Sequence, residues 1–218
     1  MDDPEQALAY ANADFEEPHQ SFIDAFRSIY DAETICGEVL DLGCGPADIT
    51  IRFARAFPDT NITGIDGSAA MLNLGQERLA RENLAHRIKL LQGYIPQFTP
   101  PVNEYNFVIS NSLLHHLHNP DVLWHYLKAV ASVNSRIFIM DLYRPDSIDC
   151  AKQMVDTYSG SEPEILKRDF FNSLCAAFTK DEVLAQLDLA GIRGLAIKTI
   201  SDRHMVIYGR INKHKNGA

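Results

Sequence analysis

Residues 39–46 read Val-Leu-Asp-Leu-Gly-Cys-Gly-Pro, a short apolar run that leads directly into a glycine turn. The apolar run predicts a buried strand, and the glycines mark its end. The helical pattern that follows places Ile49, Phe53 and Phe57 on one face. A strand that passes through glycines into a helix brings backbone N–H groups close to a ligand at the carboxyl end of the strand. This stretch therefore predicts a ligand site at the edge of a parallel sheet.

The chain on either side of this stretch alternates strand-like and helical patterns, which is typical of a parallel α/β sheet. We expect strands at residues 38–42, 61–66, 88–91, 105–110 and 136–142. Thr179 and Glu182 have the spacing of a capping box, which predicts a helix start, and Gly191 ends that helix. The last two strand-like runs, 195–200 and 204–211, are separated by a short turn and predict an antiparallel hairpin.

The length of 218 residues predicts a single domain over 1–218. Within it we expect an N-terminal helical cap at 1–34 and a core that carries the ligand site at 36–142. A helical stretch at 144–178 is longer than a crossover needs. We interpret it as an insertion and a candidate substrate lid.

Composition and charge narrow the class of protein. The formal net charge is −9, from 20 basic and 29 acidic residues, which disfavours nucleic acid as a partner. No apolar run approaches the ~18 residues of a membrane-spanning helix, and the acidic start lacks the features of a signal peptide. The 4 cysteines form no C-x-x-C pair and predict buried thiols in a reducing cytoplasm. We therefore expect a cytoplasmic protein with no membrane partner; its oligomeric state is not predicted.

Three acidic residues suggest which ligand the glycine turn receives. Asp41 ends the first predicted strand, where a carboxylate would oppose a pyrophosphate but favour a cationic ammonium or sulfonium group. Asp48 stands where the dinucleotide motif G-x-G-x-x-G needs its third glycine. Asp66 ends the second strand, where a carboxylate accepts hydrogen bonds from a ribose diol. The diol contact fits any adenosine ligand, NAD included, whereas Asp41 and Asp48 favour S-adenosylmethionine.

Three motifs together resemble those of class I S-adenosylmethionine-dependent methyltransferases of the small-molecule type. They are residues 39–46, residues 64–68 (Gly-Ile-Asp-Gly-Ser) and residues 106–117 (Asn-Phe-Val-Ile-Ser-Asn-Ser-Leu-Leu-His-His-Leu). The resemblance covers roughly residues 36–142. It implies a three-layer Rossmann-like methyltransferase fold, with a mostly parallel seven-stranded sheet that ends in an antiparallel hairpin. The Asn-Pro-Pro-Tyr motif of adenine-modifying members is absent, because Ser-Leu-Leu follows Asn111.

The same resemblance implies the residues of a cofactor site. Asp41, Gly43 and Gly45 would line the methionine part, and Asp66 would hold the ribose. The third predicted strand is often followed by Gly-Asp in the family; here Gly-Tyr follows, and the tyrosine could flank the purine. The full set implied for S-adenosylmethionine is Asp41, Gly43, Cys44, Gly45, Asp66, Gly67, Ser68, Met71, Gly93, Tyr94, Asn111 and Ser112.

Residues for catalysis and for the acceptor are less strongly indicated. His115 and His116 are candidate general bases, because histidine titrates nearest neutrality; packing of the loop is the alternative role. No metal is expected, because adjacent histidines on a helix do not face one another and no spaced carboxylate completes a ligand set. The candidate substrate-binding residues are Tyr10, Phe15, Arg144 and Arg168, with core packing or surface ion pairs as alternatives.

These patterns predict an enzyme that transfers a methyl group from S-adenosylmethionine to a small molecule by in-line displacement. Such chemistry needs mainly alignment of the nucleophile with the S–CH3 bond. One alternative is a non-catalytic S-adenosylmethionine-binding module that supports a partner enzyme. Another is an NAD-dependent oxidoreductase. The acceptor is not identified by the sequence, because this scaffold serves oxygen, nitrogen, sulfur and carbon nucleophiles.

Overall fold

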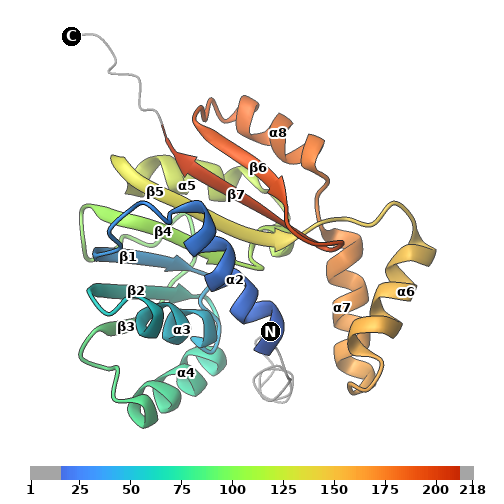
Figure 1. Cartoon of the computed structure of the whole chain (residues 1–218), viewed down its shortest axis with the longest axis horizontal. Coiled ribbons are helices and arrows are strands. Elements are labelled where there is room, and N and C mark those ends of the chain that lie inside the picture. The colour runs from blue at the N-terminus through green and yellow to red at the C-terminus, as the bar shows by residue number, and fades with distance from the viewer. Residues whose placement is uncertain (1–15, 212–218) are drawn as a thin grey trace.

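The computed structural model describes residues 16–211, which contain a 7-stranded sheet in the order β3-β2-β1-β4-β5-β7-β6 (Figure 1). The strands are β1 Gly37–Leu42, β2 Thr60–Asp66, β3 Ile88–Gln92, β4 Tyr105–Asn111, β5 Ala131–Leu142, β6 Leu195–Thr199 and β7 His204–Arg210. The helices are α2 Glu16–Ile29, α3 Asp48–Ala56, α4 Ala69–Glu82, the short 3₁₀ helix η1 Leu114–His116, α5 Asp121–Val130, α6 Ile148–Ser159, α7 Glu164–Ala176 and α8 Lys180–Leu189.

The sheet has the predicted arrangement of parallel and antiparallel strands. β1 pairs in parallel with β2 and β4, and β4 pairs in parallel with β5. β7 lies antiparallel between β5 and β6, so the predicted C-terminal hairpin is confirmed. The strand order changes direction between β1 and β4, which opens a crevice at their carboxyl ends. The predicted Rossmann-like fold is therefore confirmed.

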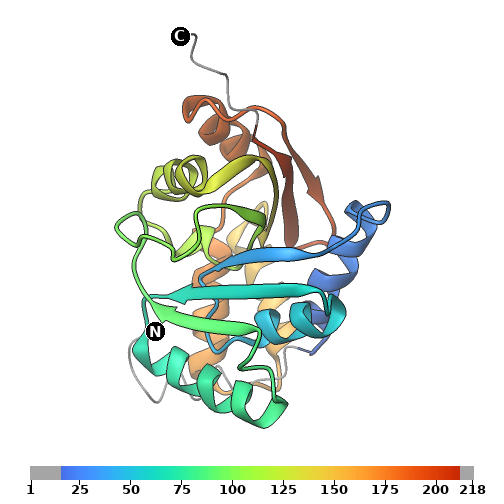
Figure 2. The ribbon, with the colours of Figure 1, turned by 90° about the vertical axis from the view of Figure 1, so that its left-hand side faces the viewer.

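Alternating side chains of the strands divide the core into two layers. In β1, Val39 packs with α2, α3 and α4 on one face, whereas Leu40 and Leu42 pack with α5 and α8 on the other. Parallel strands covered on both faces are buried along their length, as the apolar runs of the sequence predict. Figure 2 shows the sheet from the side, with helices on both faces.

Helix α2 packs on the sheet face that α3 also covers, and it does so through aromatic side chains. Phe26 is fully buried, and its ring lies 4.8 Å from that of Phe53, 5.6 Å from that of Phe107 and 5.3 Å from that of Phe138. The hydroxyl of Tyr30 donates to the carbonyl of Ile137 at 2.8 Å. The cap is therefore part of the core, and the N-terminal end of α2 reaches the carboxyl edge of the sheet (Figure 1).

Helices α6 and α7 form a pair beyond the carboxyl ends of the strands (Figure 1). The pair has its own small apolar cluster, which includes Leu142, Val155 and Leu174. A parallel bridge joins Tyr143 to Phe178, so the segment leaves the sheet and returns to it at one point. Between residues 16 and 211, no helix combines the length and apolar character needed to cross a membrane.

The start of β5 is the clearest difference between expectation and structure. The sequence predicts this strand from residue 136, whereas β5 begins at Ala131 directly after α5. The extension pairs Ala131 with Tyr105 across a register shift in β4. Such a boundary depends on pairing between strands and not on the local pattern.

Candidate active site

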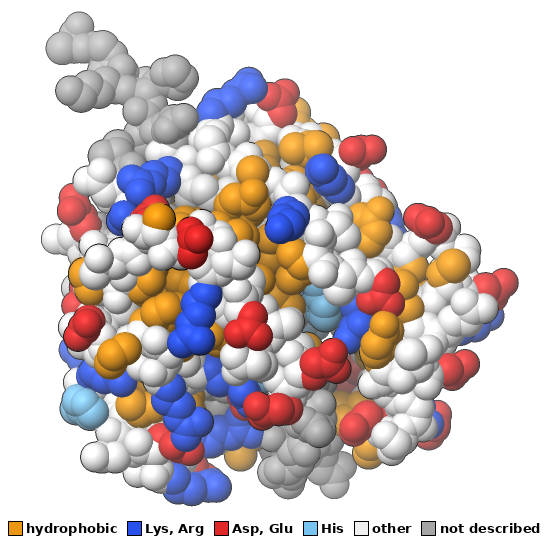
Figure 3. Space-filling model, in the orientation of Figure 1, with side chains coloured by type: hydrophobic (Ala, Val, Ile, Leu, Met, Phe, Trp, Pro, Cys, Tyr) orange, Lys and Arg blue, Asp and Glu red, His pale blue; other side chains and the backbone are white. Residues whose placement is uncertain are grey.

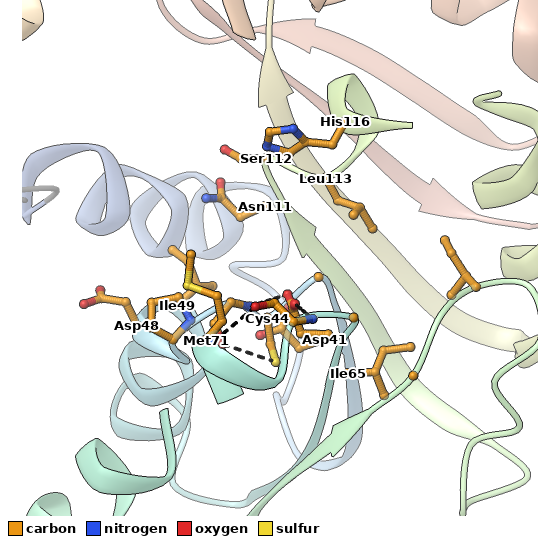
Figure 4. Close-up of a pocket in the computed structure, with 18 of the residues that line it drawn as sticks. Asp41, Cys44, Asp48, Ile49, Ile65, Met71, Asn111, Ser112, Leu113 and His116 are labelled. Carbon is orange, nitrogen blue, oxygen red and sulfur yellow. Dashed lines mark hydrogen bonds between the residues drawn. The ribbon is translucent and has the colours of Figure 1, made fainter. Parts of the chain in front are cut away.

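A cavity of about 450 Å³ lies at the carboxyl ends of β1, β2, β3 and β4, where the strand order reverses (Figure 4). It is lined by every residue that the resemblance implies for the cofactor: Asp41, Gly43, Cys44, Gly45, Asp66, Gly67, Ser68, Met71, Gly93, Tyr94, Asn111 and Ser112. These residues come from four separate segments of the chain. The structure thus brings the predicted set together around one space, of a size typical of small-molecule sites.

The glycine turn after β1 adopts backbone conformations that favour glycine. Gly43 has φ 69° and Gly45 has φ 52°, both in the left-handed region. The backbone N–H groups of Gly43 and Cys44 both donate to the carbonyl of Ile65, at 2.9 and 3.0 Å. A Cβ at Gly43 would come within 3.0 Å of the Leu113 side chain. The turn is therefore fixed against β2, and it leaves the floor of the cavity free of side chains at these positions.

Asp66 joins the first and second loops of the site. Its Oδ2 accepts from the backbone N–H of Gly45 at 2.9 Å, and its Oδ1 accepts from that of Ser68 at 2.8 Å. Ser68 in turn caps α4, where its hydroxyl accepts from the N–H of Met71. Each carboxylate oxygen keeps a second lone pair that can accept from a hydroxyl group in the cavity.

Asp41 lines the cavity but is 1% exposed. Its Oδ2 accepts from the hydroxyl of Thr50 on α3 at 2.6 Å. Burial raises the pKa of Asp41 to about 7, with Thr50 lowering it and the charge of Asp66 raising it further. Near neutral pH this carboxyl group is therefore close to its titration midpoint, and a cation in the cavity would favour its ionised form.

Cys44 lies in the same turn and is buried. Burial, together with the charges of Asp41 and Asp66, raises the pKa of its thiol well above the usual value. A protonated thiol is a poor nucleophile, so Cys44 serves as part of the cavity wall.

Asn111 and Ser112 lie on the opposite side of the cavity from Asp41 and Cys44 (Figure 4). Ser112 follows β4 with φ 57°, a left-handed conformation that is uncommon for a non-glycine residue. Its N–H donates to the carbonyl of Met140 at 2.9 Å, which holds the turn against β5. The end of β4 is therefore bent so that both side chains border the cavity.

A larger cavity of about 910 Å³ adjoins the first one and lies between α2, η1, the α6–α7 pair and the start of β7. The two cavities share His19, Asn111, Ser112 and His116 in their walls. These shared residues mark the place where a molecule in one cavity meets a molecule in the other.

His115 and His116 occupy different positions with respect to these cavities. His115 lines only the larger one, and its Nδ1 lies 2.6 Å from Oδ1 of Asp141. The side chains of His115 and Asp141 are 3% and 2% exposed. Asp141 also accepts from the backbone N–H groups of Leu114 and Leu142. Since a carboxylate only accepts, Nδ1 of His115 donates to Asp141.

His116 lines both cavities, and its ring centroid lies 4.1 Å from that of His115. Burial lowers the pKa of His116 to about 4, and the neighbouring His115 lowers it further. His116 is therefore neutral at physiological pH and is a weaker base than a free histidine.

The structure does not bring the predicted substrate-binding arginines to either cavity. The Arg144 side chain forms an ion pair with Glu182 of the capping box, and the backbone N–H of Arg144 donates to the carbonyl of Phe178. Arg168 is exposed on α7, with its Nε 3.9 Å from Oδ1 of Asp169. Tyr10 and Phe15 lie outside the described residues. Within residues 16–211 no group of three or more His, Cys, Asp or Glu side chains is placed to hold a metal.

Sequence reasoning missed residues that tertiary structure adds to the cavities. His19 of α2 lines both of them, and its Nδ1 lies 2.8 Å from Oδ1 of Asp48. His204 at the start of β7 lines the larger one, and burial lowers its pKa to about 4. No local motif marks either histidine, because each reaches the site only through the packing of its element on the sheet.

Comparisons with known proteins identify the core. Residues 39–136 match the family model described as "Methyltransferase domain". Trans-aconitate 2-methyltransferase from Rhodopseudomonas palustris strain HaA2 is 27% identical over 113 residues, which cover 52% of this chain and 40% of that protein. Demethylmenaquinone methyltransferase from Listeria monocytogenes is 35% identical over 71 residues, 32% of this chain and 30% of that protein. The matches thus span less than half the length of these curated relatives.

Solved structures extend the likeness in fold to nearly the whole chain. A SAM-dependent methyltransferase from Aquifex aeolicus is 19% identical, with a TM-score of 0.69, and the match covers 96% of this chain and 99% of that one. A plantazolicin methyltransferase, crystallised with SAH, is 16% identical with a TM-score of 0.73 and coverages of 96% and 91%. Residues 39–136 are therefore similar to a methyltransferase domain, and the chain shares the fold of solved methyltransferases over nearly its whole length.

Proposed function

We propose that this protein transfers a methyl group from S-adenosylmethionine to a small-molecule acceptor and releases S-adenosylhomocysteine. The observation that carries the proposal is the pair of adjoining cavities, which meet at Asn111, Ser112 and His116. The smaller one is lined by the residues implied for the cofactor, and the larger one offers space for an acceptor. When bound, the donor supplies an electrophilic methyl group, so the protein has mainly to align the nucleophile with it.

The residues of the smaller cavity fit an adenosine and an amino-acid moiety. Asp66 offers carboxylate lone pairs for the ribose, and the ring of Tyr94 lies beside Gly67, where a Cβ would come within 2.4 Å of it. Tyr94 is 62% exposed, so its ring is available to flank a purine. Asp41, which lines the cavity at the end of β1, favours a cationic group. We assign the ribose to Asp66 and the methionine part to Asp41 and the glycine turn.

A general base is needed only where the acceptor must lose a proton. We assign this role to His115, because Asp141 fixes its ring and leaves Nε2 as the acceptor at the larger cavity. A well-placed base contributes about 10²–10⁴-fold to a rate. His116 borders the transfer point as a neutral side chain. Arg144 and Arg168 have no part in this assignment.

The two relatives named above act on trans-aconitate and on demethylmenaquinone, so their names support a small-molecule acceptor without choosing one. We also propose a cytoplasmic location, which the free thiols of Cys36, Cys44, Cys150 and Cys175 support.

Calorimetric titration with S-adenosylhomocysteine tests the proposal. We expect binding in the micromolar range, and we expect Asp66→Ala to weaken it at least tenfold because the ribose loses its acceptor. Asp59→Ala is the matched control, since Asp59 is exposed before β2 and lines neither cavity. Absence of heat at high micromolar ligand, or binding of NADH in its place, would contradict the proposal. Binding without turnover across a broad acceptor panel would favour a non-catalytic module.

A further inference from the structure

The charge of the larger cavity indicates which acceptors it can hold. The carboxylates that line it among the described residues are Glu16, Glu17, Asp24, Glu162 and Asp169. In the same set of lining residues, Arg203 is the one arginine and there is no lysine. Acidic side chains flank the region where α2 faces the α6–α7 pair (Figure 3). Two of these carboxylates already have a cationic neighbour, Glu16 in Arg52 and Asp169 in Arg168, whereas the other three leave an excess of negative charge. This excess would repel a carboxylate or phosphate group of an acceptor.

The positive charge of Arg203 does not cancel the excess of carboxylates in the lining of the larger cavity. Its guanidinium lies over the ring of Tyr158, 3.4 Å from the centroid, and its Nη1 donates to Asp202 at 3.0 Å. The hydroxyl of Tyr158 donates to the same carboxylate at 2.7 Å. The charge of Arg203 is thus matched by Asp202, and the arginine is held by stacking.

Asp169 on α7 is one of the carboxylates that line the larger cavity. Asp169 acts on the charge of His116, which borders both cavities, and raises its pKa against the larger effect of burial. Apolar side chains stand between the polar ones, among them Met140, Leu142, Leu166 and Phe170. The cavity therefore presents an apolar wall to one part of a ligand and carboxylates to another.

From this combination we propose that the larger cavity binds acceptors that carry a protonated amine on an apolar skeleton, and that the amine nitrogen receives the methyl group. The inference rests on the proposed function, because it takes the smaller cavity as the donor site. Carboxylates such as Asp169 and Glu162 attract the ammonium group, while the apolar wall holds the skeleton.

An ammonium nitrogen has no free electron pair, so it must lose a proton before it reacts. We assign this step to Nε2 of His115, which lines the larger cavity and whose Nδ1 is held by Asp141. The N–H bond breaks toward Nε2, the freed pair forms the N–CH3 bond, and the C–S bond breaks with its pair on sulfur. The products are the methylated amine and S-adenosylhomocysteine, and the proton passes from His115 to solvent.

Three probes with one skeleton test the proposal: 2-phenylethylamine, 3-phenylpropanoate and 2-phenylethanol. Each is titrated by calorimetry into the full chain saturated with S-adenosylhomocysteine, and turnover is measured with S-adenosylmethionine. We expect the amine to bind at least tenfold more tightly than the acid, with the alcohol between them. We also expect N-methylation of the amine. An acid that binds as well as the amine, or an amine that does not bind, would overturn the proposal.

Charge-removing variants show whether the cavity carboxylates cause the preference. In the double variant Asp169→Asn, Glu162→Gln we expect the preference for the amine to fall below threefold. Asp149→Asn is the control, because Asp149 lies on α6 outside both cavities and is exposed beside Lys152. An unchanged preference in the double variant would also overturn the proposal. S-adenosylhomocysteine is titrated first, so that loss of donor binding identifies failure of the proposed function itself.

Discussion

At the scale of single residues, the protonation state of Asp41 should affect both the stability of the protein and its affinity for the ligand. Its carboxyl group is buried, and its pKa is raised from 3.8 to about 7, so the folded protein without ligand favours the neutral form. An acid whose pKa is higher in the folded than in the unfolded protein contributes most to the stability of the fold at pH values below its unfolded pKa. This contribution is lost as the pH rises through the folded pKa. The contribution of Asp41 to stability is therefore lost between about pH 4 and about pH 7.

The first prediction concerns Asp41→Asn. At pH 8 we expect the variant without ligand to be more stable than the natural protein, by up to about 4 kcal/mol as an upper bound from the pKa difference. At pH 4 the two should be alike. Chemical denaturation at both pH values measures this, with the exposed Asp59→Asn as control. An equal pH dependence in natural protein and variant would contradict it.

As the pH rises, the stability of the protein without ligand should fall, whereas its affinity for S-adenosylhomocysteine should increase. A ligand ammonium group favours ionised Asp41, so we expect binding by the natural protein to strengthen from pH 6 to pH 8. In Asp41→Asn the binding should be weaker and should vary less over the same range. Calorimetry at pH 6, 7 and 8 checks both trends.

His115 gives the second prediction at this scale. We expect His115→Gln to lower kcat by about 10²–10⁴-fold, because the proton acceptor is lost. Binding of S-adenosylhomocysteine should stay within about threefold, since His115 does not line the smaller cavity. The loss should fall on kcat while donor binding is retained, whereas a purely structural role would lower both. His125→Gln is the control, because His125 is exposed on α5.

Motifs reveal the predicted cofactor residues of the smaller cavity, but of the larger one they reveal only the part contributed by residues 111–116. The glycine turn, Asp66 and Asn111 stand in short segments whose order and spacing are set by the strands they follow. Asp141 was visible only as a strand-end residue, and nothing in the sequence pairs it with His115. That contact depends on η1 folding back over the end of β5, which is a tertiary event.

At the scale of elements, α2 is held by aromatic packing that local patterns only partly indicate. The helical spacing of Phe22 and Phe26 predicts a buried face but not the surface it covers. In the structure Phe26 is fully buried against rings from α3, β4 and β5. The face of the sheet that receives α2 is selected by these rings on other elements.

The third prediction follows for Phe26→Ala. Removing a fully buried phenylalanine costs about 3–5 kcal/mol, because apolar burial is lost and a cavity remains. We expect the free energy of unfolding to fall by this amount in chemical denaturation. Phe26→Leu, which keeps most of the volume, should cost about half as much. A cost below 1 kcal/mol in Phe26→Ala would mean that α2 does not pack in solution as described.

At the scale of the whole molecule, the larger cavity exists because segments distant in the chain meet beyond the strand tips. Its wall takes His19 from α2, Asp169 from α7 and His204 from β7. The sequence indicates helices at 144–178 and a hairpin at the C-terminus, but no pattern states where the helices lie relative to α2. The sequence predicts the 144–178 segment as a candidate substrate lid, but the assembly of the larger cavity from α2, α7 and β7 depends on tertiary packing that no local pattern indicates.

The attachment of α6 and α7 to the sheet yields the fourth prediction. The segment that contains α6 and α7 begins after Tyr143 and ends before Phe178. These two residues form a β-bridge, so the ends of the segment are adjacent. A short glycine–serine linker can therefore replace residues 146–176 without stretching the chain. No residue of α6 or α7 lines the smaller cavity, so the deletion removes none of its lining residues, although the contacts between α7 and η1 are lost.

We expect this deletion variant to bind S-adenosylhomocysteine within about threefold of the full chain but to lose methylation of the acceptor. Leu142 loses its cover from Val155 and Leu174, so some loss of stability is expected as well. Substituting Leu142→Thr in the deletion variant lowers the apolar exposure and controls for aggregation. Retained turnover would show that the acceptor does not need the α6–α7 wall, whereas lost donor binding in a folded variant would show that the pair supports the cofactor site. Since the pair supplies Asp169, Phe170 and Glu162 to the larger cavity alone, the geometry favours loss of the acceptor with the donor retained.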